Sequence, residues 1–249
     1  MPLQKKLTLL LVVATALGMA AVIAFVPNPG RPAIGVLALG GLLWLAVVRI
    51  SAARYAAALK QAAGELGLDY LAGPADEKRS AFLSKMRQLG ESDIFRWKVD
   101  GKFPAVVGDF SGFPVVVRVP VGLDFDAAAP DSTRIAAYHT VKMTGLAVYD
   151  RTRLKKPPKG RQVTLDDPAF DTRFLVVALR PEEARAVLSP QVREALLKAG
   201  DLGFRGLEVN RYGVFLHEEG KISKAEVLRK RLELVTTVAA AAARGLAGG

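Results

Sequence analysis

Hydrophobic positions follow three patterns along the chain, and each pattern predicts a different kind of element. Two uncharged apolar runs, residues 7–26 and 33–48, fill most of the first fifty positions. Between residues 94 and 149, short stretches alternate apolar and polar positions, which is typical of half-buried strands. After residue 180, apolar residues recur at helical spacing, and a pair of short strands interrupts these helical stretches. The chain therefore begins with apolar helices and continues as a mixed domain.

The two apolar runs predict a transmembrane helical hairpin over residues 1–50, with spans at about 7–26 and 33–49. A 20-residue helix is about 30 Å long, which matches the hydrocarbon thickness of a bilayer. The segment "PNPGRP" between the runs predicts a tight turn. A cleaved signal peptide and a buried soluble hairpin are the alternatives. The length of the first run, and the second run that follows it, favour the membrane hairpin.

Basic residues lie mostly on the outer flanks of the two apolar runs rather than in the turn between them. The flanking ones are Lys5, Lys6, Arg49, Arg54 and Lys60. The turn itself holds only Arg31. Because cytoplasmic flanks of membrane helices carry an excess of Lys and Arg, this distribution predicts that both termini and the soluble domain are cytoplasmic.

Residues 51–70 predict a stalk helix, because the stretch is rich in alanine and other strong helix formers. The stretch is compatible with an uninterrupted extension of the second span, and Gly67 and then Gly73-Pro74 end it. Residues 71–249 predict one soluble domain, which opens with a short helix at 77–89.

Three strands in a meander are expected next, over residues 94–99, 102–110 and 113–120. Asp100-Gly101 and Ser111-Gly112 supply the two-residue hairpin turns between them. Residues 123–134 read as a loop, and residues 138–149 as one long fourth strand.

The second half contains a strand at 173–179, helices that begin at Pro181 and Pro190, a strand pair around Asn210, and a long helix from Ser223 to Arg244. The long helix has an apolar stripe that is expected to face the core: Leu228, Leu232, Val235, Ala239 and Ala242. Strands joined mostly by hairpins, with helices largely segregated from them, predict an α+β fold with a mostly antiparallel sheet and packed helices.

Composition changes this picture in two ways. The chain has no cysteine, which excludes disulfides, thiolate metal sites and a cysteine nucleophile. Its formal net charge is +11. Six cations fall in the stretch "RTRLKKPPKGRQ": Arg151, Arg153, Lys155, Lys156, Lys159 and Arg161.

This basic stretch has four interpretations. It is a solvated loop, a contact for anionic lipid head groups, a contact for an acidic protein partner, or a nucleic-acid site. Nucleic acid is not expected, because no aromatic platform or reading helix accompanies the cations. Beside an anionic leaflet, each cation gains up to about 1 kcal/mol. The six residues are thus candidate contacts for an anionic surface.

Candidate catalytic and metal-binding residues are sparse. His217 lies beside Glu218 and Glu219, and this group is either a metal or acid–base site or the solvated polar end of a hairpin, which is the favoured interpretation. His139 shares its predicted strand face with Val141 and Met143. Zinc needs three or four ligands, so neither histidine predicts a zinc site. The acidic pairs Asp124 with Asp126, and Asp166 with Asp167, read as turns. We expect no catalytic, cofactor-binding or metal residues.

The stretches "PAFDTRFLVVALRPEEARAVLSPQVREALL" and "LEVNRYGVFLHEEG", followed by a long helix, resemble a known pattern. The chain is similar to bacterial membrane-anchored proteins of unknown function, in which an N-terminal pair of membrane helices precedes a cytosolic α+β domain. The likeness covers residues 165–245 and the hairpin. It implies a location in the bacterial inner membrane and brings no catalytic residues.

The expected function is a non-catalytic, membrane-anchored binding or scaffold module that faces the cytoplasm. One alternative is a membrane-tethered enzyme whose site is assembled from scattered Asp, Glu, Arg and His residues. Another is a subunit of a larger membrane complex. Small residues in the apolar runs would allow close helix packing in such a complex, or within the hairpin itself: Ala14, Gly18, Ala21, Gly40 and Gly41.

Overall fold

The computed structural model divides the chain into two compact units, residues 1–57 and 58–249. The structure describes residues 14–16, 18, 22, 30–72, 84, 105–118, 132–154, 156, 158–199 and 204–246. The predicted helix at 77–89 and the predicted strand at 94–99 with its Asp100-Gly101 turn lie outside the described residues, apart from Ser84, which is helical.

The longest element is α2 (Gly30–Glu65), a continuous helix of 36 residues. It joins the second predicted span to the predicted stalk without a break. It begins at Gly30, inside the segment expected to be a turn. At its other end, Leu68 N donates to Ala63 O at 2.9 Å, and Gly67 adopts a left-handed φ of 69°. Glycine adopts this conformation without steric cost, which explains why the helix ends here.

One helix, rather than two, is long and apolar enough to cross a membrane among the described residues, and it spans residues 34–65. In the first apolar run, the structure describes Ala14–Ala16, Gly18 and Val22, which are helical. The two-helix hairpin predicted from the sequence is therefore not confirmed, and a single candidate span is what the described part of the chain shows.

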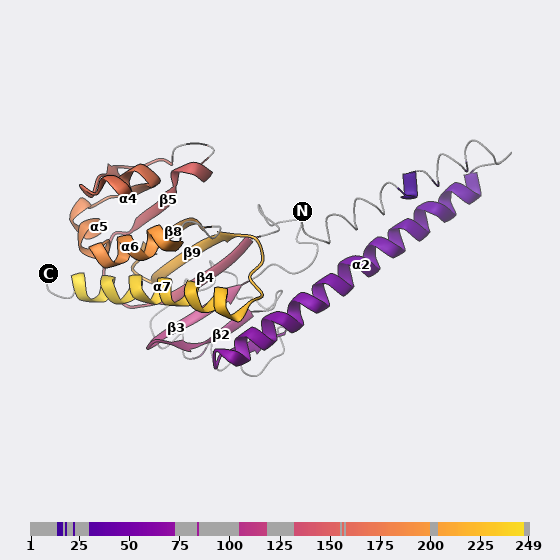
Figure 1. Ribbon diagram of the computed structural model, residues 1–249, viewed down its shortest axis with the longest axis horizontal. Coiled ribbons are helices and arrows are strands. Elements are labelled where there is room, and N and C mark those ends of the chain that lie inside the picture. The colour runs from indigo at the N-terminus through magenta and orange to yellow at the C-terminus, as the bar shows by residue number, and fades with distance from the viewer. Residues whose placement is uncertain are drawn as a thin grey trace. The chain divides into compact units, whose positions relative to one another are not determined.

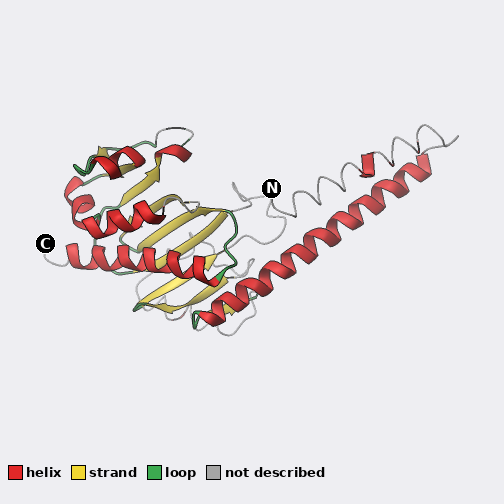
Figure 2. Ribbon diagram, in the orientation of Figure 1, coloured by secondary structure: helices red, strands yellow, loops and turns green. Residues whose placement is uncertain are grey.

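Within the described residues, the second unit is built on a nine-stranded sheet in which every pairing is antiparallel (Figures 1 and 2). The strand order is β1-β2-β3-β4-β9-β8-β5-β7-β6. The α+β class with an antiparallel sheet is confirmed. The strands are β1 (Asp69–Leu71), β2 (Ala105–Phe110), β3 (Phe113–Arg118), β4 (Ser132–Tyr138), β5 (Leu146–Asp150), β6 (Gln162–Val163), β7 (Phe174–Ala178), β8 (Phe204–Asn210) and β9 (Gly213–Glu219).

Helices cover one face of this sheet, here called the inner face. Figure 1 shows α5 (Pro181–Val187), α6 (Pro190–Ala199) and α7 (Ala225–Leu246) over it. The five residues of the predicted α7 stripe are all buried, so that prediction is confirmed. Figure 1 also shows α4 (Pro168–Arg173), which sequence analysis missed.

The opposite, outer face of the sheet also contains a buried apolar cluster. Because strand side chains alternate between faces, this cluster is separate from the helix-covered core. Its members are Leu71, Ala105, Val107, Val116, Ala136, Tyr138 and Phe215, with Tyr212 packed against them. The first half of the sheet is thus buried on both sides, which explains why its strands read as nearly continuous apolar runs.

The prediction of one long strand over residues 138–149 is wrong. β4 ends at Tyr138, the first residue of the predicted strand, residues 139–145 form a loop, and β5 begins only at Leu146. β4 itself starts at Ser132, inside the stretch predicted as a loop. β4 pairs with β3 and β9, whereas β5 pairs with β8 and β7. Glu183 of α5 holds the loop, because its carboxylate accepts bonds from Thr144 N at 2.9 Å and Thr144 Oγ1 at 2.6 Å. The chain therefore leaves one half of the sheet and enters the other.

Local turn and cap signals were more accurate. The Ser111-Gly112 turn joins β2 to β3 as predicted, and α5 and α6 begin at Pro181 and Pro190. The strand pair around Asn210 is the β8–β9 hairpin, which turns at Arg211 and Tyr212. The two-residue strand β6 and the three-residue strand β1 were missed, since such short segments carry little periodicity.

Candidate functional site

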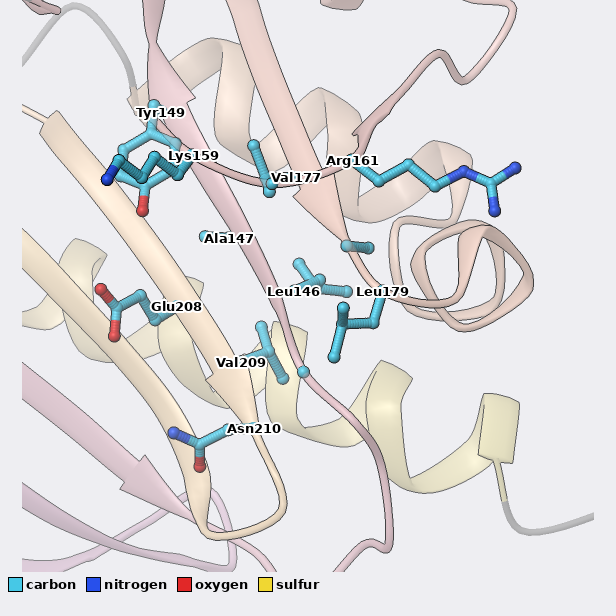
Figure 3. Close-up of a pocket in the computed structure, with 13 residues that line it drawn as sticks. Leu146, Ala147, Tyr149, Lys159, Arg161, Val177, Leu179, Glu208, Val209 and Asn210 are labelled. Carbon is cyan, nitrogen blue, oxygen red and sulfur yellow. The ribbon is translucent and has the colours of Figure 1, made fainter. Parts of the chain in front are cut away.

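A pocket on the outer face lies over β5, β7 and β8, away from the helices (Figure 3). Its volume is about 330 Å³. We call it the sheet-face pocket. Its lining residues are Gly145, Leu146, Ala147, Tyr149, Lys159, Gly160, Arg161, Val177, Ala178, Leu179, Glu208, Val209 and Asn210.

Strand register explains the floor of this pocket. Ala147 of β5 is opposite Val177 of β7 and Glu208 of β8. Residues opposite each other in neighbouring strands lie on the same face of a sheet, so these three side chains emerge together. Ala147 is small, which leaves the centre of the floor low. The exposed Leu179, at 71% of its full accessible surface, extends the apolar floor beyond the end of β7.

One wall of the pocket is the loop at residues 158–161, which crosses above β7. Ala178 N donates to Arg161 O at 3.0 Å, so the loop is bonded to the strand. Gly160 has a φ of +133°, and a Cβ there would collide with Val177 Cγ1. Only glycine allows the loop to lie this close to the sheet. The other wall is β8, which contributes Glu208 and Asn210.

The start of the same loop is anchored by Asp150 and Arg151. Asp150, which is buried, caps the single turn η2 (Arg151–Arg153) by accepting from Thr152 N at 2.9 Å. Arg151 Nε donates to the carbonyls of Asp171 and Phe174, at 3.1 Å each. Arg173 lies 3.9 Å from the Asp150 carboxylate. These bonds hold the loop against α4 and the start of β7.

The six cations that were candidate contacts for an anionic surface therefore have different roles in the structure. Arg151 holds the backbone through its Nε, and Arg153 also has an interaction within the protein. Lys155 lies outside the described residues. The side chains of Lys156, Lys159 and Arg161 are exposed and have no hydrogen bond or ion pair within the part of the chain that the structure describes. Of these three, Lys159 and Arg161 line the sheet-face pocket.

Electrostatics inside the pocket are mixed. Desolvation raises the pKa of Glu208, and the charge of Arg134 opposes this shift. Desolvation, with the charge of Glu208, raises the pKa of Tyr149. The phenol of Tyr149 is therefore neutral at physiological pH. Figure 3 shows that the Arg161 side chain extends outward from the rim.

His139 is 9% exposed and lies directly after β4. Its Nδ1 accepts from Val141 N at 3.2 Å, which places the ring proton on Nε2. Burial lowers its pKa to about 4. Its environment is that of a neutral histidine that orders the loop at 139–145.

His217 lies on the outer face of β9, opposite Arg134 of β4. Burial and the charges of Arg134 and Arg205 lower its pKa to about 4. An imidazole with so low a pKa is a weak base at neutral pH. The adjacent Glu218 points to the inner face instead, where Arg231 of α7 binds it at 2.6 and 2.7 Å. The two residues do not form an acid–base pair.

Only one of the two acidic pairs lies within the described residues. Asp124 and Asp126 lie outside the described residues. Asp167 caps α4 by accepting from Phe170 N at 3.2 Å, and it pairs with Arg193 at 3.2 Å. The expected turn at Asp166 is present, with a positive φ of 57°, but it leads into a helix rather than a strand. Within the described ranges, no group of three acidic or histidine side chains could hold a metal ion.

Sequence reasoning missed several pocket residues, namely Ala147, Tyr149, Leu179, Glu208 and Asn210. They belong to strands that are distant in sequence, and each looks ordinary in its own stretch. Glu208 alternates with apolar neighbours as any solvent-facing strand residue does. The sequence signal that indicates part of the site is the glycine of "KPPKG", because a glycine in a loop often allows close approach to another segment.

Comparisons with known proteins identify a family model that matches part of the chain and a solved structure with a similar fold. Residues 119–202 match the model of a family described as protein of unknown function (DUF3137). The fold is similar to the crystal structure of the mycobacterial trehalose monomycolate transport factor A, with a TM-score of 0.51 and 15% sequence identity. That likeness covers 77% of this chain and 96% of the other. No curated protein matches the chain by sequence.

The family match includes the pocket residues contributed by β5, the loop and β7, whereas those from β8 lie beyond its end. It overlaps the stretch at 165–202 on which the resemblance to membrane-anchored proteins of unknown function was based. At 15% identity, the structural likeness shows a shared fold.

Proposed function

We propose that this protein is a membrane-anchored, non-catalytic binding or scaffold module whose α+β domain faces the cytoplasm. The observation that carries the proposal is α2. Its apolar portion exposes a series of large side chains: Ile34, Leu37, Leu39, Leu42, Leu43, Leu45 and Ile50. The same helix continues to Leu59, Ala62 and Ala63, which are buried in the second unit.

An exposed apolar helix of this length is unfavourable in water, because each fully exposed leucine forgoes about 1.5–3 kcal/mol of burial. A bilayer supplies the missing apolar surroundings. Because α2 is continuous, a bilayer that surrounds its apolar portion also holds the attached α+β domain at the membrane.

A second membrane helix is part of the proposal. A Cβ added at Gly40 of α2 would lie 2.5 Å from Thr15 Oγ1, and one at Gly18 would lie 3.3 Å from Val36 Cγ1. Small residues at such contacts allow helices in a membrane to approach closely. This packing supports the hairpin of spans at 7–26 and 33–49.

Fractionation of the full chain tests the anchor. We expect the protein to sediment with membranes, to resist alkaline extraction and to require detergent for release. Glutamates at Leu39 and Leu42 should lower the membrane-bound fraction strongly, because a charge at the centre of a span costs about 2.5–3.5 kcal/mol. Leu179→Glu is the matched control, since Leu179 is also exposed but belongs to the soluble domain. A chain that is soluble without detergent would refute the anchor.

A reporter fused to the C-terminus tests sidedness. The excess of Lys and Arg outside the predicted hairpin leads us to expect activity from a reporter that works only in the cytoplasm. Activity only from an exported reporter would reverse the orientation. A mature N-terminus that starts after residue 26 would instead support the cleaved signal peptide.

The chemistry of the pocket supports binding rather than catalysis. Among its lining residues Glu208 is the one acid, and neither histidine is among them. His139 and His217 have pKa values of about 4, too low for effective general bases at neutral pH. Incubation of the purified chain with panels of ester, phosphate and glycoside substrates should therefore give no turnover; turnover lost on altering Glu208 or Tyr149 would favour the tethered enzyme.

A second candidate function is a subunit of a membrane transport assembly. The structural neighbour favours it, because that protein is named as a transport factor. Purification from cross-linked membranes distinguishes the two candidates. A complex of fixed stoichiometry with a transporter supports the subunit, and a chain recovered without one supports the simpler module.

A further inference from the structure

The sheet-face pocket has an unequal distribution of charge between its two walls. Lys159 and Arg161 stand on the loop wall, and their side chains have no partner among the described residues. Glu208 and Asn210 stand on the β8 wall. Between them lies an apolar floor that includes Ala147, Val177 and Leu179 (Figure 3). A ligand that fills the pocket must satisfy all three parts.

The cations of the loop wall favour a ligand that carries a negatively charged group. Lys156 is a third cation whose side chain has no partner among the residues that the structure describes, and it is not one of the pocket's lining residues. The loop also has a fixed position, because Gly160 lies against Val177, and Arg161 O accepts from Ala178 N. The cations are therefore attached to a backbone that is held in place against the floor.

A flat anionic bilayer fits this geometry poorly. The floor is concave, and Glu208 on the far wall would repel lipid phosphates and nucleic-acid phosphates alike. An extended peptide fits better, because it presents a carboxylate, an apolar side chain and a backbone N–H within a few residues. The carboxylate matches Lys159, the apolar group matches the floor, and the N–H matches the carboxylate of Glu208.

We propose that the sheet-face pocket binds an extended, acidic and apolar segment of a partner protein, with Lys159 as its charge contact in the pocket, Arg161 as a charge contact at the rim, and Ala147 and Val177 as its apolar contact. This inference rests on the proposed function as a binding module and names the class of its partner.

The test uses the full chain in phosphatidylcholine nanodiscs and three labelled peptide probes. The first alternates Glu and Leu, the second alternates Lys and Leu, and the third alternates Glu and Ser. Fluorescence anisotropy measures binding. We expect the Glu–Leu peptide to bind, and the other two to bind about tenfold more weakly or not at all, because each lacks one of the two required features.

Charge reversal locates the contact. The double variant Lys159→Glu and Arg161→Glu should weaken Glu–Leu binding by about tenfold or more. Lys156→Glu is the matched control on the same loop, outside the pocket, and should change binding by less than about threefold. Ala147→Trp, which fills the floor, should abolish binding while both cations remain. Circular dichroism confirms that each variant is folded.

Several results would overturn the inference. They are equal binding of the Glu–Ser peptide, equal loss in Lys156→Glu, no loss in the double variant, or no binding of the Glu–Leu peptide. Flotation of the nanodiscs with phosphatidylglycerol vesicles, abolished by the same double variant, would assign the cations to lipid instead. A membrane-bound chain that ignores the peptides refutes only this inference, whereas a soluble chain refutes the anchor whatever the peptides do.

Discussion

Arg231 and Glu218 form an ion pair that is almost completely shielded from water. Arg231 is 1% exposed and Glu218 is 2% exposed. The guanidinium contacts both carboxylate oxygens, at 2.6 and 2.7 Å, and also donates to Ala199 O at 3.1 Å. The pair joins β9, α6 and α7. Burial raises the pKa of Glu218, and the bond from Arg231 opposes that shift.

Glu218→Gln should lower the free energy of unfolding by about 3–5 kcal/mol, because it leaves Arg231 buried without a counter-charge. Glu226→Gln removes the exposed pair with Lys230 on the same helix and should cost less than about 1 kcal/mol. Denaturant unfolding in detergent, followed by circular dichroism, gives both values. Equal losses in the two variants would show that burial of the first pair has no energetic consequence. Glu218→Leu combined with Arg231→Met should recover most of the loss.

Gly160 is a second position where the identity of a single residue decides the local structure. Gly160→Ala introduces both a collision with Val177 and an unfavourable φ, and should destabilise the protein by about 1–3 kcal/mol. Gly220→Ala is the control, because Gly220 also has a positive φ, of 92°, but has open space around it. Unfolding measurements on both variants separate the two effects. If Gly220→Ala costs as much, the close approach of the loop contributes nothing.

Among the elements, the loop at 139–145 is what separates β4 from β5, and α5 holds it. Glu183→Ala removes Oε2, the one atom that accepts from both Thr144 N and Thr144 Oγ1, and should cost about 1.5–3 kcal/mol, since hydrogen bonds to a charged group are lost. Hydrogen exchange should accelerate specifically in residues 139–145. Glu182→Ala is the matched control, because Glu182 is the exposed neighbour in the same helical turn. Unchanged exchange in the Glu183 variant would mean that strand pairing alone fixes this loop.

At the scale of the whole molecule, two histidines make stability depend on pH. His139 and His217 each have a folded pKa of about 4, below the ordinary value of 6.5. The folded state therefore binds fewer protons than the unfolded state between these values. Stability is fully present above pH 6.5 and is lost as the pH falls toward 4. At pH 5 the loss is about 2 kcal/mol for each histidine.

His139→Asn should reduce this pH dependence by about half, because asparagine can accept from Val141 N but cannot be protonated. Unfolding free energies at pH 7 and pH 5 test it. Combining it with His217→Asn should remove most of the loss on acidification, while Glu208 and Glu218, whose pKa values are raised, act in the opposite direction. An unchanged slope in the double variant would assign the effect to carboxylates instead.

How much of the molecule could be anticipated depends on the range of the interactions involved. The start of α5 at Pro181, the turn at Ser111-Gly112 and the buried stripe of α7 are set by neighbours within a few residues, and all three were predicted correctly. The long strand at 138–149 failed, because an apolar stretch looks the same whether it forms one strand or two.

The sequence by itself determined the apolar N-terminal region, the α+β class, the positions of most caps and turns, and the location of the basic loop. These features depend on local periodicity and on the conformational preferences of single residues. Tertiary structure alone decided that β4 pairs with β9, that Arg151 binds backbone carbonyls, and that Lys159 faces Glu208 across an apolar floor. Strand order and pocket walls are set by packing between distant segments, and no local pattern encodes which distant segment will be the neighbour.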